Sequence, residues 1–556
     1  MPYAHEQTET WNTTAEQIDD IPILIAHMRR MGLPQALDRH IPTRAYWGNL
    51  SVGWTAAVWL THLLSCSDHK PAHVQQWVET HIAALRWCIG SEITHADVGI
   101  DRLHDVLIGL SQDDRWQAIE TDLNRRMLRA WPWTSRQVNL RLYEGRSWFV
   151  EPSGAFQIAR VHPWRARTLR QSIVLATIRA SNLPFVTWSF PEDHVPPVLF
   201  ARILERISQD LPSQRLRFIG DSLFAPGLRG AVHMRNDEYL CPLPDTHPDS
   251  LNPLTAHFAT HTPACAAGRN GNPHHLTADD SIEWYAPVSV EIDGATVAWN
   301  ERRIAVRSPV QAHRLEEALR TRLVRAEAAL LALVERKRGK RRPRSLEALR
   351  EAAHAILDSY QVHGLLRLDF AEQVQERLVR RYRGRPTGMR VERDVGLNVS
   401  TDADALAQAI RRLGWQTFVS NIAPHDLSAD RILAIAAPVS GFERLNGRPL
   451  SLAPHEVHTP ELETGLVRLL ALGLRTLALL ETIARDQLIK EEVLSASDSE
   501  RAASRTTGER LLDAFRDIML TPGINQRLGA ITPLSPLQQR VLHLVALSPD
   551  IYRMPG

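Results

Sequence analysis

Apolar residues recur at helical spacing through the first quarter of the chain. Four of them share one face of a predicted helix over Ile21–Met31, which Gly32 and Pro34 are expected to end. Further helices are predicted over Val52–Cys66, Val74–Ile89 and Asp97–Leu110. Residues 1–130 are therefore expected to form a helical N-terminal module. This module either docks a helix in a DNA groove or only packs against the rest of the protein.

From Gln137 the spacing changes to that of short strands. A helix is predicted over Pro196–Gln209, a strand over Arg215–Gly220 running into Asp221, then another helix and a strand over Glu238–Leu243. The earlier strand candidates are Gln137–Tyr143, Phe156–Arg160, Ser172–Ile178 and Phe185–Phe190. This order of strands and helices resembles a ribonuclease-H-like core.

A second region interrupts this predicted core. Residues 245–280 are typical of a loop, and Ile282–Val306 is expected to form a hairpin turning at Asp293–Gly294. Helices over His313–Val334 and Leu346–Tyr360 and a strand over Met389–Val399 follow. On one face of the first of these helices lie Leu315, Leu319, Leu323, Leu330 and Val334.

The core is expected to resume with a strand over Trp415–Asn421. Asp426 or Ser428 would then cap a helix over residues 430–445, and residues 463–490 and 508–520 are predicted to be helical. The fold class is therefore mixed α+β and α/β, with a core split by a large α+β insertion and helical regions at both ends. The expected division is 1–130, 131–245 (first part of the core), 246–410 (basic insertion), 411–460 (remainder of the core) and 461–556 (helical C-terminal region).

Composition narrows the class of protein. With 44% apolar and 23% charged residues, the chain is typical of a globular protein rather than a disordered one. Its four cysteines contain no CxxC pair, which argues against a zinc ribbon and a disulfide scaffold and favours a reducing, cytoplasmic compartment. The apolar runs 52–66 and 467–480 are expected to be buried helices rather than membrane spans. No phosphate-binding GxxxxGK[ST] motif is present, so ATP is not an expected ligand.

Charge is concentrated in the insertion. The whole chain has a net charge of +2, but residues 302–394 contain 23 Lys and Arg against 12 Asp and Glu. Clustered arginines favour contacts to phosphate, so double-stranded DNA is the expected partner, with a solvated loop as the alternative. The candidate DNA-binding residues are Arg336, Lys337, Arg338, Lys340, Arg341, Arg342, Arg344, Arg380, Arg381, Arg383 and Arg385.

Several segments spread over nearly the whole chain carry a family resemblance. They include FIGDSLFA (218–225), LGWQTFVSN (413–421), GFERLNGRPLSL (441–452) and TPLSPLQQRVLHLVALSPDIY (532–552). With these segments the chain resembles the DDE transposases of bacterial insertion sequences, in the branch with a long β-rich insertion. The resemblance implies metal-dependent cleavage and transfer of DNA strands, terminal inverted repeats as the DNA partner, and a homodimer as a candidate assembly.

The resemblance also implies a site of three carboxylates that hold two Mg²⁺ (or Mn²⁺) ions. The second carboxylate is Asp221. At the first position the family has an Asp where this chain has Arg141, and at the third it has a Glu where this chain has Val439. Two of the three metal ligands are therefore replaced, and a metal, if bound, would rest on Asp221.

Two nearby acids are candidate substitutes. Glu443 follows Val439 by one helical turn, and Glu144 follows Arg141 by three residues. The alternative is that both face solvent and that Asp221 pairs with Arg141.

Three hypotheses about function follow. The chain is a transposase-like DNA-binding protein with impaired catalysis, which includes a regulator derived from a transposase. Alternatively, it is a working transposase in which Glu443 and Glu144 substitute, or a protein–protein scaffold that binds no DNA.

Overall fold

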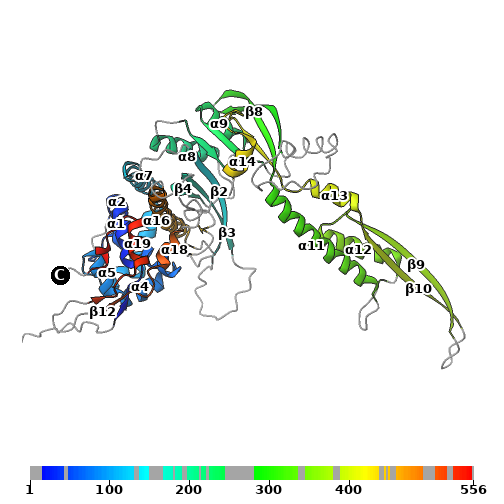
Figure 1. The fold of residues 1–556 in the computed structure, drawn as a ribbon, viewed down its shortest axis with the longest axis horizontal. Coiled ribbons are helices and arrows are strands. Elements are labelled where there is room, and N and C mark those ends of the chain that lie inside the picture. Colours follow the sequence, from blue (N-terminus) through cyan, green and yellow to red (C-terminus); the bar gives the residue numbers. More distant parts are fainter. Residues whose placement is uncertain are drawn as a thin grey trace, which may run out of the picture. The chain divides into compact units, whose positions relative to one another are not determined.

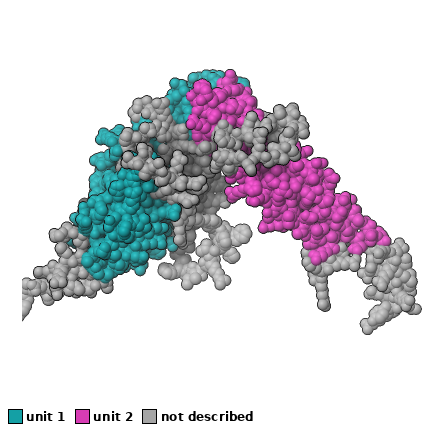
Figure 2. All heavy atoms as spheres, in the orientation of Figure 1, with its two compact units in different colours: residues 1–241, 287–299, 436–556 teal, residues 242–286, 300–435 magenta. Residues whose placement is uncertain are grey.

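The computed structural model describes most of the chain in two compact units, shown in Figure 2. The first unit contains residues 1–241, 287–299 and 436–556, and the second contains residues 242–286 and 300–435. Described are residues 15–42, 48–130, 137–149, 167–178, 182–190, 197–211, 215–220, 225–243, 281–292, 294–335, 343, 345–379, 388–436, 444–445, 449–450, 459–492, 507–521 and 530–553.

Two helices of the N-terminal module have the predicted bounds, and local capping explains each. Helix α1 (Ile21–Met31) ends at Gly32, whose φ of 71° is left-handed and suits glycine. Helix α3 (Val52–Cys66) begins after Ser51, whose Oγ accepts a hydrogen bond from the Trp54 amide. The other helices here are α2 (Leu33–His40), α4 (Pro71–Thr80), α5 (Ile82–Ile89), η1 (His95–Val98), α6 (Ile100–Ser111) and α7 (Asp113–Ala130).

The prediction of one helix over Val74–Ile89 is wrong, because α4 and α5 are separate. His81 lies between them, and its ring Nδ1 lies 2.7 Å from the Trp77 carbonyl oxygen. The His81 amide instead donates to the carbonyl of Val78, one residue closer. The ring thus takes the acceptor that a continuing α-helix would need, and the helix ends there.

The C-terminal region of the first unit packs against these helices. The central element is α16 (Pro460–Glu492), whose Gly465 allows close approach to α6, since a Cβ there would stand 2.2 Å from the Leu107 carbonyl oxygen. The predicted helix over 508–520 ends early, because α18 covers only Gly508–Asp513 and Met519–Thr521 pairs as strand β12 with β1 (Glu16–Gln17). The region also contains β13 (Ala530–Ile531), α19 (Pro536–Leu544) and η5 (Pro549–Tyr552).

The sheet of the first unit has the strand order β4-β3-β2-β5-β6. Strand β2 pairs antiparallel with β3 and parallel with β5, and β5 pairs parallel with β6. The strands are β2 (Gln137–Phe149), β3 (Arg167–Ile178), β4 (Leu183–Phe190), β5 (Arg217–Ile219) and β6 (Glu238–Pro242), with helices α8 (Pro197–Asp210) and α9 (Pro226–Met234) between them in sequence. The strand predicted over Phe156–Arg160 lies outside the described residues.

Strands β7 (Ser281–Ile292) and β8 (Ala295–Arg307) form the predicted hairpin, with Gly294 at a φ of 79°. Its tip belongs to the first unit, where the Trp299 indole N–H donates to the Tyr239 hydroxyl at 2.8 Å. In the second unit β8 pairs with β11 (Trp415–Ser420), which α14 (Ala429–Ala436) follows in sequence.

The remainder of the second unit is a helix–hairpin module, defined here as residues 309–411. It contains α11 (Pro309–Val334), α12 (Leu346–Tyr360), β9 (Leu366–Val379), β10 (Gly388–Thr401) and α13 (Ala403–Arg411). Leucines of α11 and α12 pack on Leu366, Val395 and Leu397 at the base of the β9–β10 hairpin, which extends past the helices (Figure 1). Leu319, Leu323 and Leu330 are buried as predicted, whereas Leu315 is 38% exposed.

Secondary structure of both kinds makes the protein a mixed α+β protein. None of the helices in the described ranges is long and apolar enough to cross a membrane.

Candidate functional site

Arg141 and Asp221, which the resemblance assigns to the first and second acid positions, lie in or just after two adjacent parallel strands. Asn139 of β2 is paired with Ile219 of β5. Arg141 stands two residues after Asn139 in β2, where it is opposite Leu175 of β3. Asp221 stands two residues after Ile219 in the sequence, directly after the last described residue of that segment, Gly220.

The other predicted site residues are not among the described ones. Glu144 lies in β2 opposite Ser172, and only its backbone is described. Asp221, Val439 and Glu443 lie outside the described residues, and so do Arg336, Lys337, Arg338, Lys340, Arg341, Arg342, Arg344, Arg380, Arg381, Arg383 and Arg385. Among the residues that are described, no group of three or more His, Cys, Asp or Glu side chains could hold a metal ion.

Arg444 is held by two helices of the C-terminal region. It directly follows Glu443, and its guanidinium is bound by Glu481 of α16 at 2.6 Å and Glu509 of α18 at 2.9 Å. The side chain is only 11% exposed. Sequence analysis assigned no role to Arg444, and the structure shows it bridging α16 and α18 through these two carboxylates.

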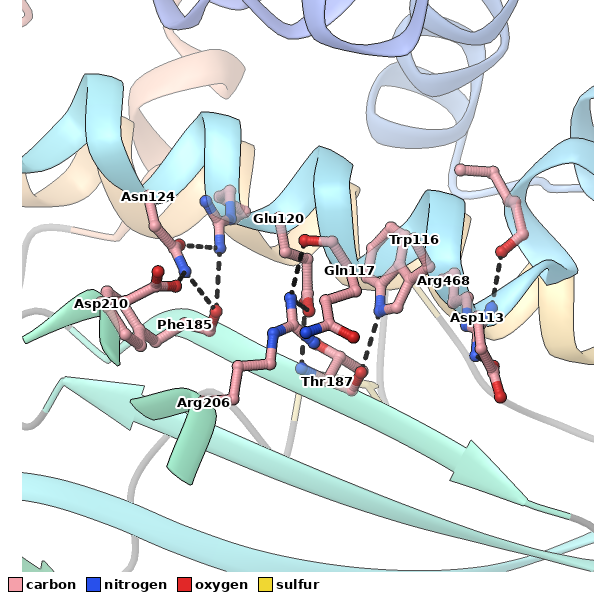
Figure 3. A network of polar contacts seen from close by, with 12 residues as sticks. Asp113, Trp116, Gln117, Glu120, Asn124, Phe185, Thr187, Arg206, Asp210 and Arg468 are labelled. Atoms are coloured by element: carbon pink, nitrogen blue, oxygen red, sulfur yellow. Dashed lines mark hydrogen bonds and ion pairs between the residues drawn. The ribbon is translucent and has the colours of Figure 1, made fainter. Parts of the chain in front are cut away.

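A network of buried polar groups joins α7, β4, α8 and α16 (Figure 3). At its centre the Glu120 carboxylate of α7 lies 2.8 Å from the Arg206 guanidinium of α8, and both side chains are at most 3% exposed. The other Glu120 oxygen accepts a hydrogen bond from the Thr187 amide of β4 at 2.9 Å. The Trp116 indole N–H donates to the Thr187 carbonyl. One carboxylate therefore holds a helix and a strand to α7.

The network continues along α7 to Asn124. Its amide nitrogen donates to the Phe185 carbonyl at 2.9 Å and to the Asp210 carboxylate at 2.8 Å. Its amide oxygen accepts a hydrogen bond from Arg475 of α16 at 2.7 Å. At the other end, Arg468 of α16 pairs with Asp113 and donates to the Leu110 carbonyl. The network thus binds α16 to the sheet through α7.

Burial determines the electrostatics of this network. Desolvation raises the pKa of the Glu120 carboxyl, and the neighbouring Arg206 and Arg475 oppose this effect. Desolvation lowers the pKa of Arg475 to about 10, so the guanidinium is still charged at neutral pH. Glu120 is paired with Arg206, and Arg468 is paired with Asp113. Because these pairs join helices to one another, we interpret the network as a structural element of the first unit.

A cavity of about 560 Å³ in the first unit is lined by Asp19, Asp20, Trp77, His81 and Asp513, among others. Asp20 is 7% exposed, and burial raises its pKa to about 6 although the Ser65 hydroxyl donates to it. Asp19 has a left-handed φ of 36°, and its carboxylate accepts from the Ile518 amide. A perturbed acid in a large cavity is a candidate binding feature.

Sequence analysis missed Asp20, Arg468 and Arg475 as buried charges. For the two arginines a signal was present, because they stand seven residues apart in an otherwise apolar helix and so share one face. Asp20 directly precedes a helix, a position where aspartate usually caps the helix at the surface. Its position therefore gave no sign of burial.

No protein-family model matches the chain, and no curated protein matches it.

Proposed function

We propose that the chain is a transposase-like DNA-binding protein with a ribonuclease-H-like core that has lost the ligands for metal-dependent strand transfer. The observation that carries the proposal is the pairing of β2 with β5. It brings the strand that contains Arg141 beside the strand that leads to Asp221.

The strand order supports a ribonuclease-H-like core. An antiparallel set β4-β3-β2 is continued by two parallel strands, β5 and β6, with α8 and α9 in the connections. The periodicity of the sequence predicts the same succession of strands and helices, which resembles a ribonuclease-H-like core. In such a core the first acid stands on one strand and the second acid follows the neighbouring parallel strand. Arg141 is in β2, and Asp221 follows β5 by two residues.

The donor set does not fit two magnesium ions. Mg²⁺ prefers oxygen ligands, and Arg141 and Val439 supply none. A guanidinium about 4 Å from a dication costs about 8 kcal/mol at an effective dielectric constant of about 20. This is the reason for proposing that strand transfer is lost.

Two connections of the helix–hairpin module support DNA binding. Residues 336–344 join α11 to α12 and contain seven basic residues in nine, and residues 380–387 join β9 to β10 and contain four arginines. Along the hairpin, Arg377 is directly opposite Arg390. Like charges at paired positions destabilise a hairpin unless an anion lies near them, and a DNA phosphate would be such an anion.

Salt dependence of binding tests the proposal. For the full chain and a labelled DNA duplex we expect log K to fall with log salt concentration with a slope of about −5 or steeper. Replacing Arg341, Arg342 and Arg344 together by Gln should make the slope shallower by about 1 to 3.

The matched control replaces Arg516, Arg540 and Arg553 by Gln, because these arginines are exposed in the C-terminal region and belong to neither connection. This control variant should keep the wild-type slope. A wild-type slope near zero would refute DNA binding and favour the protein–protein scaffold. Equal slopes for the two triple variants would refute the assignment to the connection.

Cleavage tests the loss of catalysis separately. With Mg²⁺ or Mn²⁺ and DNA that carries terminal inverted repeats, we expect no nicking by the wild type or by Arg141→Asp, because Val439 is still present. Nicking by the wild type would favour the working transposase, with Glu443 and Glu144 as ligands. Nicking by Arg141→Asp alone would show that the third ligand is not at Val439.

A further inference from the structure

The cavity of about 560 Å³ in the first unit has an acidic wall. Four carboxylates and one guanidinium line it, and they belong to Asp19, Asp20, Glu509, Asp513 and Arg516. A hollow in which one sign of charge predominates concentrates ions of the opposite sign. The cavity is therefore a candidate site for a cation, and this inference does not rest on the proposed DNA binding.

Two of these carboxylates are matched by arginines. Asp513 pairs with Arg516, and Glu509 lies 2.9 Å from the guanidinium of Arg444. Arg444 also binds Glu481, so its single positive charge is shared between two acids. Asp513 and Glu509 therefore do not by themselves require a further cation.

The other two carboxylates accept hydrogen bonds from neutral groups. Asp19 accepts from the side-chain amide of Gln17 at 2.8 Å and from the backbone amide of Ile518 at 3.2 Å. Asp20 accepts from the Ser65 hydroxyl. Within the described ranges, no basic side chain pairs with either acid. The net negative charge of the wall therefore comes from Asp19 and Asp20.

Asp20 is the acid at which an added positive charge has the largest effect, because the residue is only 7% exposed. Burial raises its pKa to about 6, and the charges of Asp19 and Asp513 act in the same direction. The carboxyl is thus mostly ionised at pH 7.5. Burial raises the pKa of the Cys66 thiol in the same wall to about 11, and the charges of Asp20 and Asp19 again act in that direction. A buried carboxylate without a counter-charge is costly, so a ligand that supplies one is favoured.

The rest of the wall indicates which kind of cation fits. Apolar side chains also line the cavity, among them Ile21, Leu64, Trp77 and Leu512. In the part of the chain that the structure describes, no three His, Cys, Asp or Glu side chains could hold a metal ion. An ammonium group instead brings three N–H donors for carboxylate oxygens, and an apolar body attached to it would contact the apolar side chains. We propose that this cavity binds a primary organic amine, whose ammonium group is held by Asp19 and Asp20.

Calorimetric titration of the full chain with benzylamine, in the absence of DNA, tests this site. The titration is done at pH 7.5 and constant ionic strength, where the amine is charged and a histidine such as His81 of the wall is ordinarily neutral. Benzyl alcohol has a similar apolar body without the charge, and methylamine has the charge with almost no apolar body. We expect saturable binding of benzylamine, and binding about tenfold weaker or more for each of the other two compounds. Saturating benzylamine should also raise the Tm by about 1 to 3 °C.

An asparagine substitution removes the charge of Asp20 and keeps its shape. Asp20→Asn should weaken benzylamine binding by about 10- to 100-fold. The variant should still fold, because an amide is neutral when buried and its oxygen can accept from Ser65. The matched control is Asp101→Asn, at an exposed position of α6 that does not line the cavity. This control should bind benzylamine as the wild type does.

Four outcomes would overturn the proposal. The first is absence of benzylamine binding by the wild type, and the second is equal affinity for benzylamine and benzyl alcohol, which would mean that the charge is not recognised. Equal affinity for benzylamine and methylamine would refute the contribution of the apolar wall. Unchanged binding in Asp20→Asn, or an equal loss in Asp101→Asn, would place the amine elsewhere on the protein. Should Asp20→Asn not fold, the comparison of the three compounds on the wild type still decides the matter.

Discussion

Charge is used in opposite ways by the buried network of the first unit and the helix–hairpin module of the second. Glu120, Arg206 and Arg475 are each less than 5% exposed, and each is paired or hydrogen-bonded. In the helix–hairpin module, ion pairs such as Arg320–Glu316 lie at the surface, where the arginine is 57% exposed.

The two regions differ in whether a charge stabilises the fold or remains available to bind a partner. A desolvated charge that is matched to one partner specifies which elements meet, and it binds nothing else without breaking the fold. An exposed charge contributes little to stability and stays available to a partner. The module contains most of the positive excess of residues 302–394, so it is the region to which we assign the proposed DNA binding.

Neutralising the central carboxylate of the network should have the largest effect. Glu120→Gln keeps the shape but leaves Arg206 buried without a counter-charge, which should cost about 3 to 5 kcal/mol of unfolding free energy. Urea unfolding measures the loss, and hydrogen exchange should rise in α7 and β4.

The matched change in the module is Glu316→Gln, which breaks the exposed pair with Arg320 one helical turn away. It should cost about 0.3 to 0.5 kcal/mol. If the two substitutions cost the same, the contrast between buried and exposed charge in these two regions is wrong.

The apolar core of the module should give a loss of unfolding free energy that is smaller than that of Glu120→Gln. Leu330 of α11 is fully buried against α12 and the hairpin base, so Leu330→Ala should cost about 2 to 4 kcal/mol. The neighbouring Leu331 is 44% exposed, and Leu331→Ala should cost less than about 1 kcal/mol.

Hydrogen exchange locates these losses. Leu330→Ala should raise exchange in α11, α12, β9 and β10 and leave α7 and β4 unchanged. Equal costs at Leu330 and Leu331 would contradict the packing described for α11. Faster exchange of α7 in Leu330→Ala would contradict the separation of the two regions.

Elements with a strong local pattern were predictable from the sequence. Helix α12 has the predicted bounds because Ser345 caps it and its apolar spacing is regular. Strand β9 was missed because its alternation is interrupted by Ala371, Glu372 and Gln373 at consecutive positions, and its pairing with β10 is a tertiary interaction.

The candidate site was predictable only in part. The positions of β2 and β5 were predictable from the sequence. Their parallel pairing was not, because local patterns do not determine which strands pair. The burial of these charges depends on contacts between residues far apart in sequence, such as Asn124 with Arg475. From the sequence alone, such residues cannot be distinguished from charged residues at the surface. The burial of Asp20 was likewise not predictable from its sequence context.

Asp20 sharpens the comparison, because it is a buried acid in the first unit and no arginine among the described residues pairs with it. Burial raises its pKa from 3.8 to about 6, so its folded state holds a proton that the unfolded state has lost between about pH 4 and 6. The stabilisation is complete below pH 4 and is lost as the pH rises to about 6. The expected loss is about 3 kcal/mol, which is two pKa units at about 1.4 kcal/mol each.

Asp20→Asn tests this loss because an amide stays neutral at every pH and its oxygen can still accept from Ser65. Relative to the wild type, the variant should gain up to about 3 kcal/mol of unfolding free energy between pH 4 and pH 7. Ser65→Ala should have the opposite effect, because the hydroxyl lowers the pKa of Asp20, so its removal steepens the decline with pH. Urea unfolding at a series of pH values measures both.

Parallel pH profiles for the wild type and Asp20→Asn would mean that Asp20 is solvated in the folded protein. In that case unpaired charge is tolerated in the first unit as it is in the second, and the comparison fails at this residue.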